Sequence, residues 1–222
     1  MTPELLLGLA SLEDAHDIFE LVYSHPDPFL RQASLDQIQN WVNNGACWII
    51  RDLKQGKIVG ACNIKVPETD RCHPPEPAEF GGIFLHPDYR RLGISDALAT
   101  LALSSYYWDT DPDSLSPIPL ISHVHVDNQK PRSLLDRLGF LHVKTIKVPD
   151  DAPGFEHMPR DEHGQLFGDE FELPPERRVR LFRDMAELLS TGMVGEIPVQ
   201  IAAALEMNPV ELHRLASFLE GQ

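Results

Sequence analysis

One stretch of the sequence combines backbone and side-chain features that suit a bound anion. Gly82-Ile-Phe-Leu-His-Pro-Asp-Tyr-Arg-Arg-Leu-Gly-Ile-Ser95 begins as an apolar strand, turns, and leads at once into an amphipathic helix. The turn carries Arg90, Arg91, Gly93 and Ser95. Unpaired N–H groups at a helix start point toward one spot, and the helix dipole favours negative charge there. The turn therefore predicts a phosphate or pyrophosphate site.

The elements around this turn follow from hydrophobic periodicity and from helix start and stop residues. Predicted helices cover 11–24, 93–108 and about 130–138, and another runs from Ser34 to the Asn44-Gly45 stop. Predicted strands cover 47–51, 57–66, 79–85, 120–126, 140–148 and 167–173, with polar and proline-rich loops at 67–78 and 109–119. This order predicts an α/β fold with a mixed sheet.

The spacing Arg90-x-x-Gly93-x-Ser95 resembles the pyrophosphate loop of the GCN5-related N-acetyltransferases (GNAT), with Ser95 where Gly or Ala is usual. The His-Pro-Asp-Tyr-Arg-Arg run that precedes it, after an apolar strand, is more specific than a glycine pattern alone. The resemblance covers about residues 4–173. It implies a GNAT-type mixed, mostly antiparallel sheet, splayed beside the strand 79–85 and flanked by helices.

A second, weaker motif follows at the expected distance. Val126-Asp-Asn128, a helix and Gly139-Phe140 match the Asn, helix and Gly-Phe order of the family, although Gly139-Phe140 is equally explained as a helix stop and a core aromatic. The resemblance implies that Asn128 caps the helix and contacts the coenzyme arm, and that Ser133 lines that arm. Leu135 stands where many members carry a tyrosine that protonates the leaving thiolate, and leucine cannot do so.

The resemblance implies acetyl-CoA, or another acyl-CoA, as cosubstrate and no metal. The residues that it implies for coenzyme binding are Phe84, Leu85, Arg90, Arg91, Leu92, Gly93, Ile94, Ser95, Asn128 and Ser133. The alternative is a strand-to-helix turn with two solvated arginines. Cys72-His73 and Cys62 lack the paired spacing that zinc sites show, which argues against a metal there.

The chemistry that the family implies is direct attack of an amine on a thioester, which requires a base because a protonated amine has no lone pair. Glu79, at the start of the core strand, is the first candidate base. His125, on the neighbouring strand, is the second, because imidazole titrates near neutral pH. His123 alternates onto the same face. Each has an ordinary structural alternative, a surface carboxylate or a sheet histidine.

The resemblance places the acceptor pocket among the first two helices, their loop and the last hairpin. Phe29 and Trp41 are the candidate substrate-binding residues there, with His25, Asp27 and Asp36 nearby. Aromatic and acidic groups suit a cationic amine, whether a small molecule or a protein group. An ordinary surface loop is the alternative.

After Pro174-Pro175 the pattern changes, so residues 174–222 are predicted to form a helical extension to an acyltransferase domain at 1–173. The segment 197–220 resembles a repressor-type helix-turn-helix with few basic residues on its second helix. The extension could form a homodimer, cover the acceptor site or bind DNA. The competing function is accordingly an acyl-CoA-sensing DNA-binding regulator.

The amino-acid composition excludes further classes of function. The formal charge of −15 argues against general nucleic-acid or anionic-membrane binding, and is compatible with an amine substrate. Three cysteines at irregular spacing indicate reduced thiols. The start of the chain lacks a signal-peptide pattern, and the sequence lacks a continuous apolar stretch of about 18 residues. A cytoplasmic protein without a membrane partner is expected.

Overall fold

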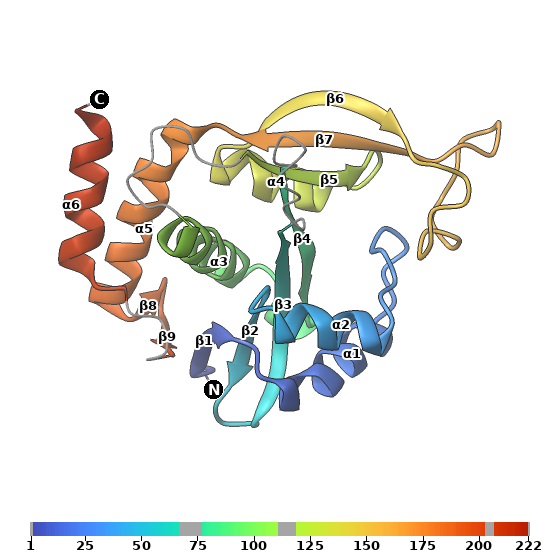
Figure 1. Cartoon of the computed structure of the whole chain (residues 1–222). Coiled ribbons are helices and arrows are strands. Elements are labelled where there is room, and N and C mark those ends of the chain that lie inside the picture. The colour runs from blue at the N-terminus through green and yellow to red at the C-terminus, as the bar shows by residue number, and fades with distance from the viewer. Residues whose placement is uncertain (1, 67–76, 111–118, 203–206, 222) are drawn as a thin grey trace.

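The structure is a computed structural model that describes residues 2–66, 77–110, 119–202 and 207–221 (Figure 1). Its helices are α1 (Ala15–Tyr23), α2 (Leu35–Asn43), α3 (Ile94–Thr110), α4 (Gln129–Leu138), α5 (Arg178–Thr191) and α6 (Pro209–Glu220). Its strands are β1 (Leu5–Leu9), β2 (Cys47–Asp52), β3 (Lys57–Lys65), β4 (Ala78–Leu85), β5 (Leu120–His125), β6 (Leu141–Lys147), β7 (Phe167–Leu173), β8 (Met193–Val194) and β9 (Ile197–Ile201). The mixed α/β class expected from the sequence is confirmed.

Among the described residues the strands form one nine-stranded sheet in the order β6-β7-β5-β4-β3-β2-β1-β9-β8. Most neighbours are antiparallel, whereas β4 runs parallel to β5 and β1 runs parallel to β9. That parallel pair extends only over Ala78↔Leu120 and Glu79↔Ile121. Beyond these positions β4 continues beside β3 and β5 continues beside β7, so the sheet divides into two halves (Figure 1). The expected splay therefore lies directly after Glu79.

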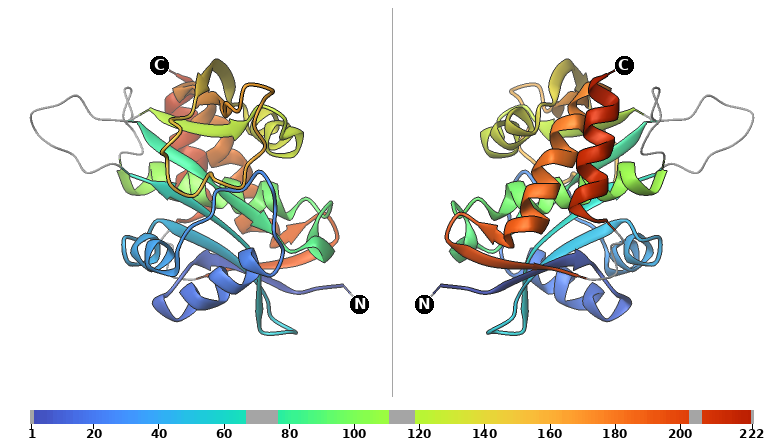
Figure 2. Two further views of the ribbon diagram at one scale, coloured as in Figure 1. Left: turned by 90° about the vertical axis from the view of Figure 1, so that its right-hand side faces the viewer. Right: turned by 90° about the vertical axis from the view of Figure 1, so that its left-hand side faces the viewer.

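Helices cover both faces of the divided sheet. One hydrophobic cluster joins α3, α4 and α5 to the sheet, with Leu98, Leu101 and Phe182 fully buried in it. A second cluster joins α1 and α2 to the opposite face, through residues such as Ile18 and Ile38. Both α1 and α2 carry an apolar side, and Ser34 caps α2 by accepting a hydrogen bond from the Gln37 N–H. Figure 2 shows α5 and α6 side by side at one end of the molecule.

The expectation of an all-helical segment after residue 173 is wrong for two short strands, β8 and β9, which pair with each other. Residues 197–201 form β9, which pairs in parallel with β1, an N-terminal strand that the sequence analysis did not predict. The alternation of buried Ile197 and Val199 with exposed Pro198 and Gln200 has the two-residue period of a strand. The first helix expected for a helix-turn-helix therefore begins as sheet, while residues 203–206 lie outside the described residues.

Candidate active site

The segment between β4 and α3 is anchored before it reaches its glycine. Tyr89 is buried, and its hydroxyl donates a hydrogen bond to the Asp52 carboxylate and accepts one of 2.8 Å from Gln55 Nε2. Arg90 then donates from Nε to the carbonyl oxygen of Leu85 over 3.1 Å. The His-Pro-Asp-Tyr part of the motif thus fixes the position of the loop, and the residues after it remain available for a ligand.

Two left-handed residues shape the turn itself. Arg91 has a φ of 66° and Gly93 a φ of 77°, a conformation that costs a residue with a side chain more than it costs glycine. The Gly93 carbonyl accepts the first helical hydrogen bond of α3, from the Asp96 N–H at 3.1 Å. The N–H groups of Ile94 and Ser95 therefore precede the helical hydrogen-bond ladder, as an anion site at a helix start requires.

A groove of about 810 Å³ runs from this turn along the open side of β4 to α4. Among the residues expected for coenzyme binding, those that line it are Phe84, Leu85, Arg90, Arg91, Ser95 and Asn128. Ile94 is instead fully buried in the core, and Leu92 lies beside the β8–β9 turn. Ser133 is exposed, and its hydroxyl donates to the Gln129 carbonyl at 3.1 Å. Leu92, Gly93 and Ile94 can thus contribute to coenzyme binding only through their backbone groups.

The groove concentrates basic groups in a chain of strongly negative net charge. Arg90, Arg91, Lys130 and Arg137 line it, and of the described lining residues Asp27 alone carries a carboxylate. Lys130 was not expected among the coenzyme-binding residues, because its only sequence signal is its position in the first turn of α4. Positive side chains, free helix-start donors and an unpaired strand edge fit a long anion with a peptide-like arm. The donor set therefore fits an acyl-CoA.

The start of α4 differs from the expected geometry in one respect. Asn128 is the N-cap residue, yet its side chain makes no capping hydrogen bond in the described structure, so its amide remains available to the groove. Leu135 is fully buried and lines the groove, in agreement with its apolar identity. The position therefore supplies packing in place of a proton donor.

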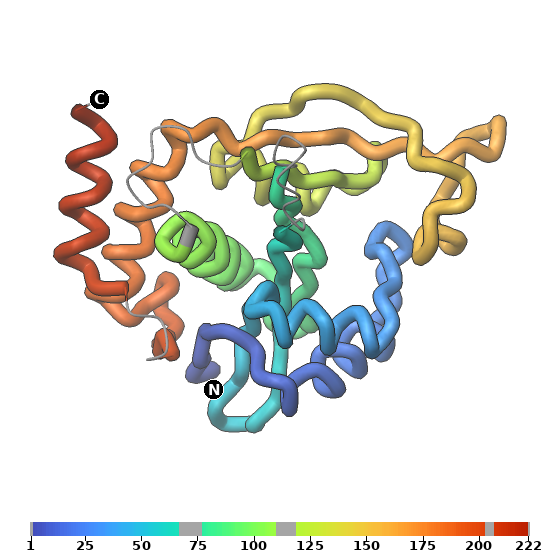
Figure 3. The backbone as a smooth tube through the Cα atoms, viewed as in Figure 1, coloured from blue at the N-terminus to red at the C-terminus, as the bar shows by residue number. Residues whose placement is uncertain are grey.

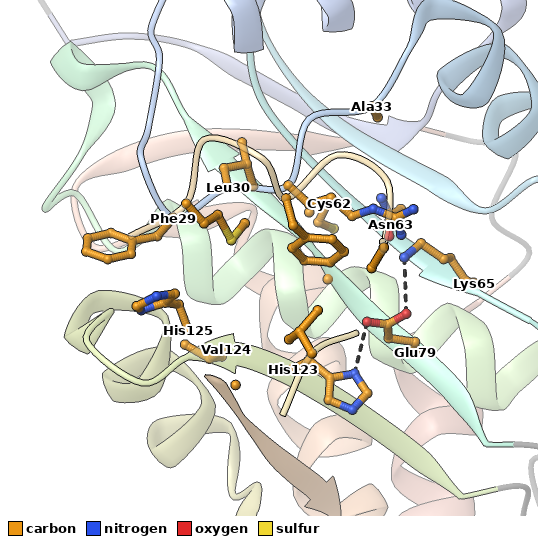
Figure 4. A pocket seen from close by; sticks show the side chains of 18 of the residues that line it. Phe29, Leu30, Ala33, Cys62, Asn63, Lys65, Glu79, His123, Val124 and His125 are labelled. Atoms are coloured by element: carbon orange, nitrogen blue, oxygen red, sulfur yellow. Dashed lines mark hydrogen bonds and ion pairs between the residues drawn. The ribbon is translucent and has the colours of Figure 1, made fainter. Parts of the chain in front are cut away.

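A second cavity, of about 380 Å³, is lined by residues of α1, α2, β3, β4 and β5 (Figure 4). Phe29 and Trp41, the expected substrate-binding residues, both line it. Asp36 is exposed on α2 and is absent from the described lining, so the acidic attraction expected for the acceptor is not present at that position. Apolar side chains from α1, α2 and the segment between β6 and β7 contribute to its wall.

The two cavities share part of their lining. The residues that border both of them are Phe29, Leu30, Gly81, Gly82, His123, Val124 and His125. The strand residues among them lie where β4 and β5 have separated, so the groove and the second cavity meet at the splay. Two ligands that enter from different directions can therefore come into contact at one point between the strands.

The Glu79 carboxylate lies in the second cavity between two donors (Figure 4). Oε2 is 3.1 Å from Lys65 Nζ, and Oε1 is 3.1 Å from His123 Nδ1. Partial burial disfavours the charged form, but the hydrogen bonds and positive charges of His123 and Lys65 outweigh it and lower the pKa of Glu79 to about 2. By itself this carboxylate is thus a weak base.

His123 links two carboxylates. Its Nδ1 faces Glu79, and its Nε2 is 3.3 Å from Glu170 Oε2. The hydrogen bond to Glu79 raises the pKa of His123 above its ordinary value of 6.5, against the smaller effect of burial. The ring is also partly open to solvent. The imidazole thus provides the proton-binding capacity near neutral pH that Glu79 lacks.

His125 occupies the expected strand but uses both ring nitrogens for backbone contacts. Nε2 is 2.9 Å from the carbonyl oxygen of Pro159, so it must donate, and Nδ1 accepts from the Asp127 N–H at 3.1 Å. The ring also lies 4.9 Å from the ring of Phe29. This geometry favours a role in positioning the segment after β6 over a role as a base.

The described residues show no sign of a metal centre or of a membrane-spanning helix. No group of three or more His, Cys, Asp and Glu side chains in the described ranges could hold a metal ion, while Cys72 and His73 lie outside those ranges. Within the same ranges, every helix is too short or too polar to traverse a bilayer.

Comparison with known proteins agrees with this geometry. The sequence profile of the acetyltransferase (GNAT) family matches residues 12–140, more than half of the chain. No curated protein sequence matches the chain. Among solved structures, a chain of the NatC complex bound to Gag peptide and CoA is 16% identical with a TM-score of 0.57, covering 77% of this chain and 98% of its own.

Two bacterial structures share the fold at similarly low sequence identity. Ribosomal-protein-S5-alanine acetyltransferase from Vibrio fischeri is 14% identical with a TM-score of 0.54, covering 75% of this chain and 91% of its own. Spermidine N-acetyltransferase from Vibrio cholerae is 18% identical with a TM-score of 0.52, covering 77% of this chain and 93% of its own. Identities this low show similarity of fold alone.

Proposed function

We propose that this chain, which belongs to the GNAT family of acetyltransferases, transfers an acetyl or other short acyl group from acyl-CoA to the primary amine of an acceptor. The observation that carries the proposal is the meeting of two cavities at the splay. One is basic and begins at a helix start, and the other contains a carboxylate paired with an imidazole.

The basic groove is the proposed coenzyme site. The N–H groups of Ile94 and Ser95, with the side chains of Arg91 and Lys130, would hold the diphosphate. The open edge of β4 near Phe84 would hold the arm. When bound, acyl-CoA supplies a thioester carbonyl open to amine attack and a thiolate that leaves readily, since a free thiol has a pKa of about 8.5. Leu135 is compatible with this, because such a leaving group needs little help from an acid.

Glu79 and His123 together are the proposed base. His123 lowers the pKa of Glu79, and Glu79 raises the pKa of His123. The two groups therefore titrate as a pair, and one proton is shared between them. Glu79 faces the acceptor cavity and passes the proton of the amine to the neutral imidazole of His123, which then holds the positive charge and releases a proton to solvent. His125 is proposed to position the surrounding loop.

Thiol release with acetyl-CoA and a panel of amines tests the function. The proposal expects saturable release that depends on both substrates. It fails if none of the amines raises thiol release above the rate of hydrolysis. The rival function, a DNA-binding regulator, is not favoured, because Ile197–Ile201 at the start of the expected DNA-binding motif form strand β9. A sequence-specific gel shift at moderate salt, without turnover, would support that rival.

A further inference from the structure

Two loops meet over the acceptor cavity. One connects α1 to α2 and the other connects β6 to β7 (Figure 3). The Gln32 N–H donates to the Gly154 carbonyl at 3.1 Å, and Arg31 Nε donates to the Pro153 carbonyl at 3.2 Å. His157 Nε2 adds a contact of 3.0 Å with the Leu30 carbonyl. These contacts form a bridge, residues 30–32 with 153–157, that joins elements from the two halves of the divided sheet.

A glycine allows the bridge to close. Gly154 has a φ of 83°, and a Cβ atom placed there would lie 2.5 Å from the backbone oxygen of Gln32. Any other residue would clash with backbone and adopt a strained conformation. While the bridge is closed, the surface of a folded protein cannot lie against the cavity floor. The acceptor group must therefore belong to a molecule small enough to fit beneath the bridge.

The cavity wall indicates the body of that molecule. The rings of Trp41, Phe29 and Phe155 line it together with Ile38 and Met158. Aromatic and aliphatic walls stabilise an apolar ligand by removing its surface from water, by about 25 cal/mol per Å². A volume of about 380 Å³ lies at the small end of the ~300–1,000 Å³ range typical of small-molecule sites.

The charges of the cavity indicate how many amines it admits. Glu79 is already paired with Lys65 and His123, so it is not a free counter-ion for a second cationic group. Arg31 and Lys65 also lie over the rings of Phe155 and Trp41, at 5.2 and 5.7 Å. Nearby positive charge repels a polyamine. The same charge lowers the pKa of a single amine and favours its neutral, nucleophilic form.

We infer that the acceptor is a compact monoamine with an apolar, preferably aromatic, body. This inference rests on the proposed acyl transfer and names the class of acceptor for the same site. The bridge excludes amines that project from a folded protein, the walls select the apolar body, and the cations disfavour additional amino groups.

A comparison of different amines as acceptors, each with acetyl-CoA as donor, tests the inference. Phenethylamine, spermidine and a short lysine-containing peptide would be compared by the kcat/KM for thiol release. Phenethylamine should exceed each of the others at least tenfold. Equal or better use of spermidine or the peptide would overturn the inference while leaving acyl transfer intact. Trp41→Ala should raise the KM for phenethylamine, whereas Phe218→Ala, an exposed aromatic on α6, should not.

Two glycine variants from one loop test the bridge. Gly154→Ala should open it and lower the preference for phenethylamine over the peptide severalfold. Gly164→Ala is the matched control, because Gly164 is also left-handed, with a φ of 74°, but has no described atom within 4 Å of an added Cβ. An unchanged preference in Gly154→Ala, with the fold retained, would contradict the role of the bridge.

Binding separates the inference from the proposed reaction. Calorimetry with phenethylamine and CoA needs no turnover. Binding that Trp41→Ala weakens supports the acceptor class even if thiol release is absent for every amine, a result that would reject only the proposed acyl transfer. Absence of phenethylamine binding to the wild-type protein would overturn the inference itself.

Discussion

The Glu79 carboxylate lies 3.1 Å from the imidazole of His123, although the two residues belong to strands that separate immediately afterwards. Glu79 is in the last paired position of β4 beside β5, and His123 is two residues beyond its partner, Ile121. The contact therefore lies at the inner end of the splay. A proton-accepting pair in this position is next to both cavities and to solvent.

Replacing the carboxylate tests its part in proton removal. Glu79→Gln keeps the shape of the side chain but cannot take up a proton, so kcat should fall by about 10²–10⁴-fold. The affinity for acetyl-CoA should stay the same, because Glu79 does not line the groove in the described structure. Rapid-mixing kinetics and calorimetry measure the two quantities. Glu172→Gln, on β7, is the control. Wild-type turnover at all pH values would remove Glu79 from this role.

The pH dependence of turnover tests His123. Below its pKa the ring is already protonated and cannot receive a further proton, so kcat should rise with pH and then level off. Because Glu79 raises that pKa, the midpoint should lie above 6.5. In His123→Gln the step should disappear or shift. His213→Gln, in the exposed part of α6, should keep the wild-type profile, and a profile shared by all three proteins would contradict the assignment.

A carboxylate in the turn before α3 tests the coenzyme site. Gly93→Glu should weaken acetyl-CoA binding at least about fivefold, because like charges about 4 Å apart repel by about 1–4 kcal/mol and 1.4 kcal/mol corresponds to a factor of ten. Gly56→Glu introduces the same charge at another left-handed glycine, of φ 67°, with open space around it. Calorimetry on both variants distinguishes strain from repulsion. Equal affinities would refute the assignment of the loop.

Substitutions in the C-terminal helix α5 test whether the chain unfolds as one unit. Met185 of α5 is fully buried in the cluster that contains α3, so Met185→Ala should cost about 2–5 kcal/mol and lower the Tm of the whole protein. Arg183→Ala removes only an exposed ion pair with Glu220 and should cost at most about 1 kcal/mol. Calorimetry should show one transition. A separate early transition in Met185→Ala would show that residues 174–222 unfold independently.

Local patterns were sufficient to predict the central part of the fold. The run from Glu79 to Ser95 combines an apolar strand, a turn with Gly93 and a helix start, and these features are close together in sequence. The family and the mixed sheet that it implies are confirmed. The placement of Phe84, Arg90 and Asn128 along one groove follows from that local geometry.

Features that depend on distant segments could not be predicted in the same way. The register that brings His123 beside Glu79 depends on the pairing of β4 with β5, and the sequence does not distinguish a free His125 from one bound to the Pro159 carbonyl. The strand Ile197–Ile201 was interpreted as a helix because its short apolar run fits either period, and its partner lies at the opposite end of the chain.

The parallel pairing of Leu5 with Val199 and of Leu7 with Ile201 has a consequence for synthesis. β1 leaves the ribosome well before β9, which is one of its two neighbours in the sheet. Until β9 follows, β1 presents an uncovered edge, which is a template for aggregation. A chain shortened before β9 keeps this edge exposed, so the pairing with β9 protects the folded protein from aggregation.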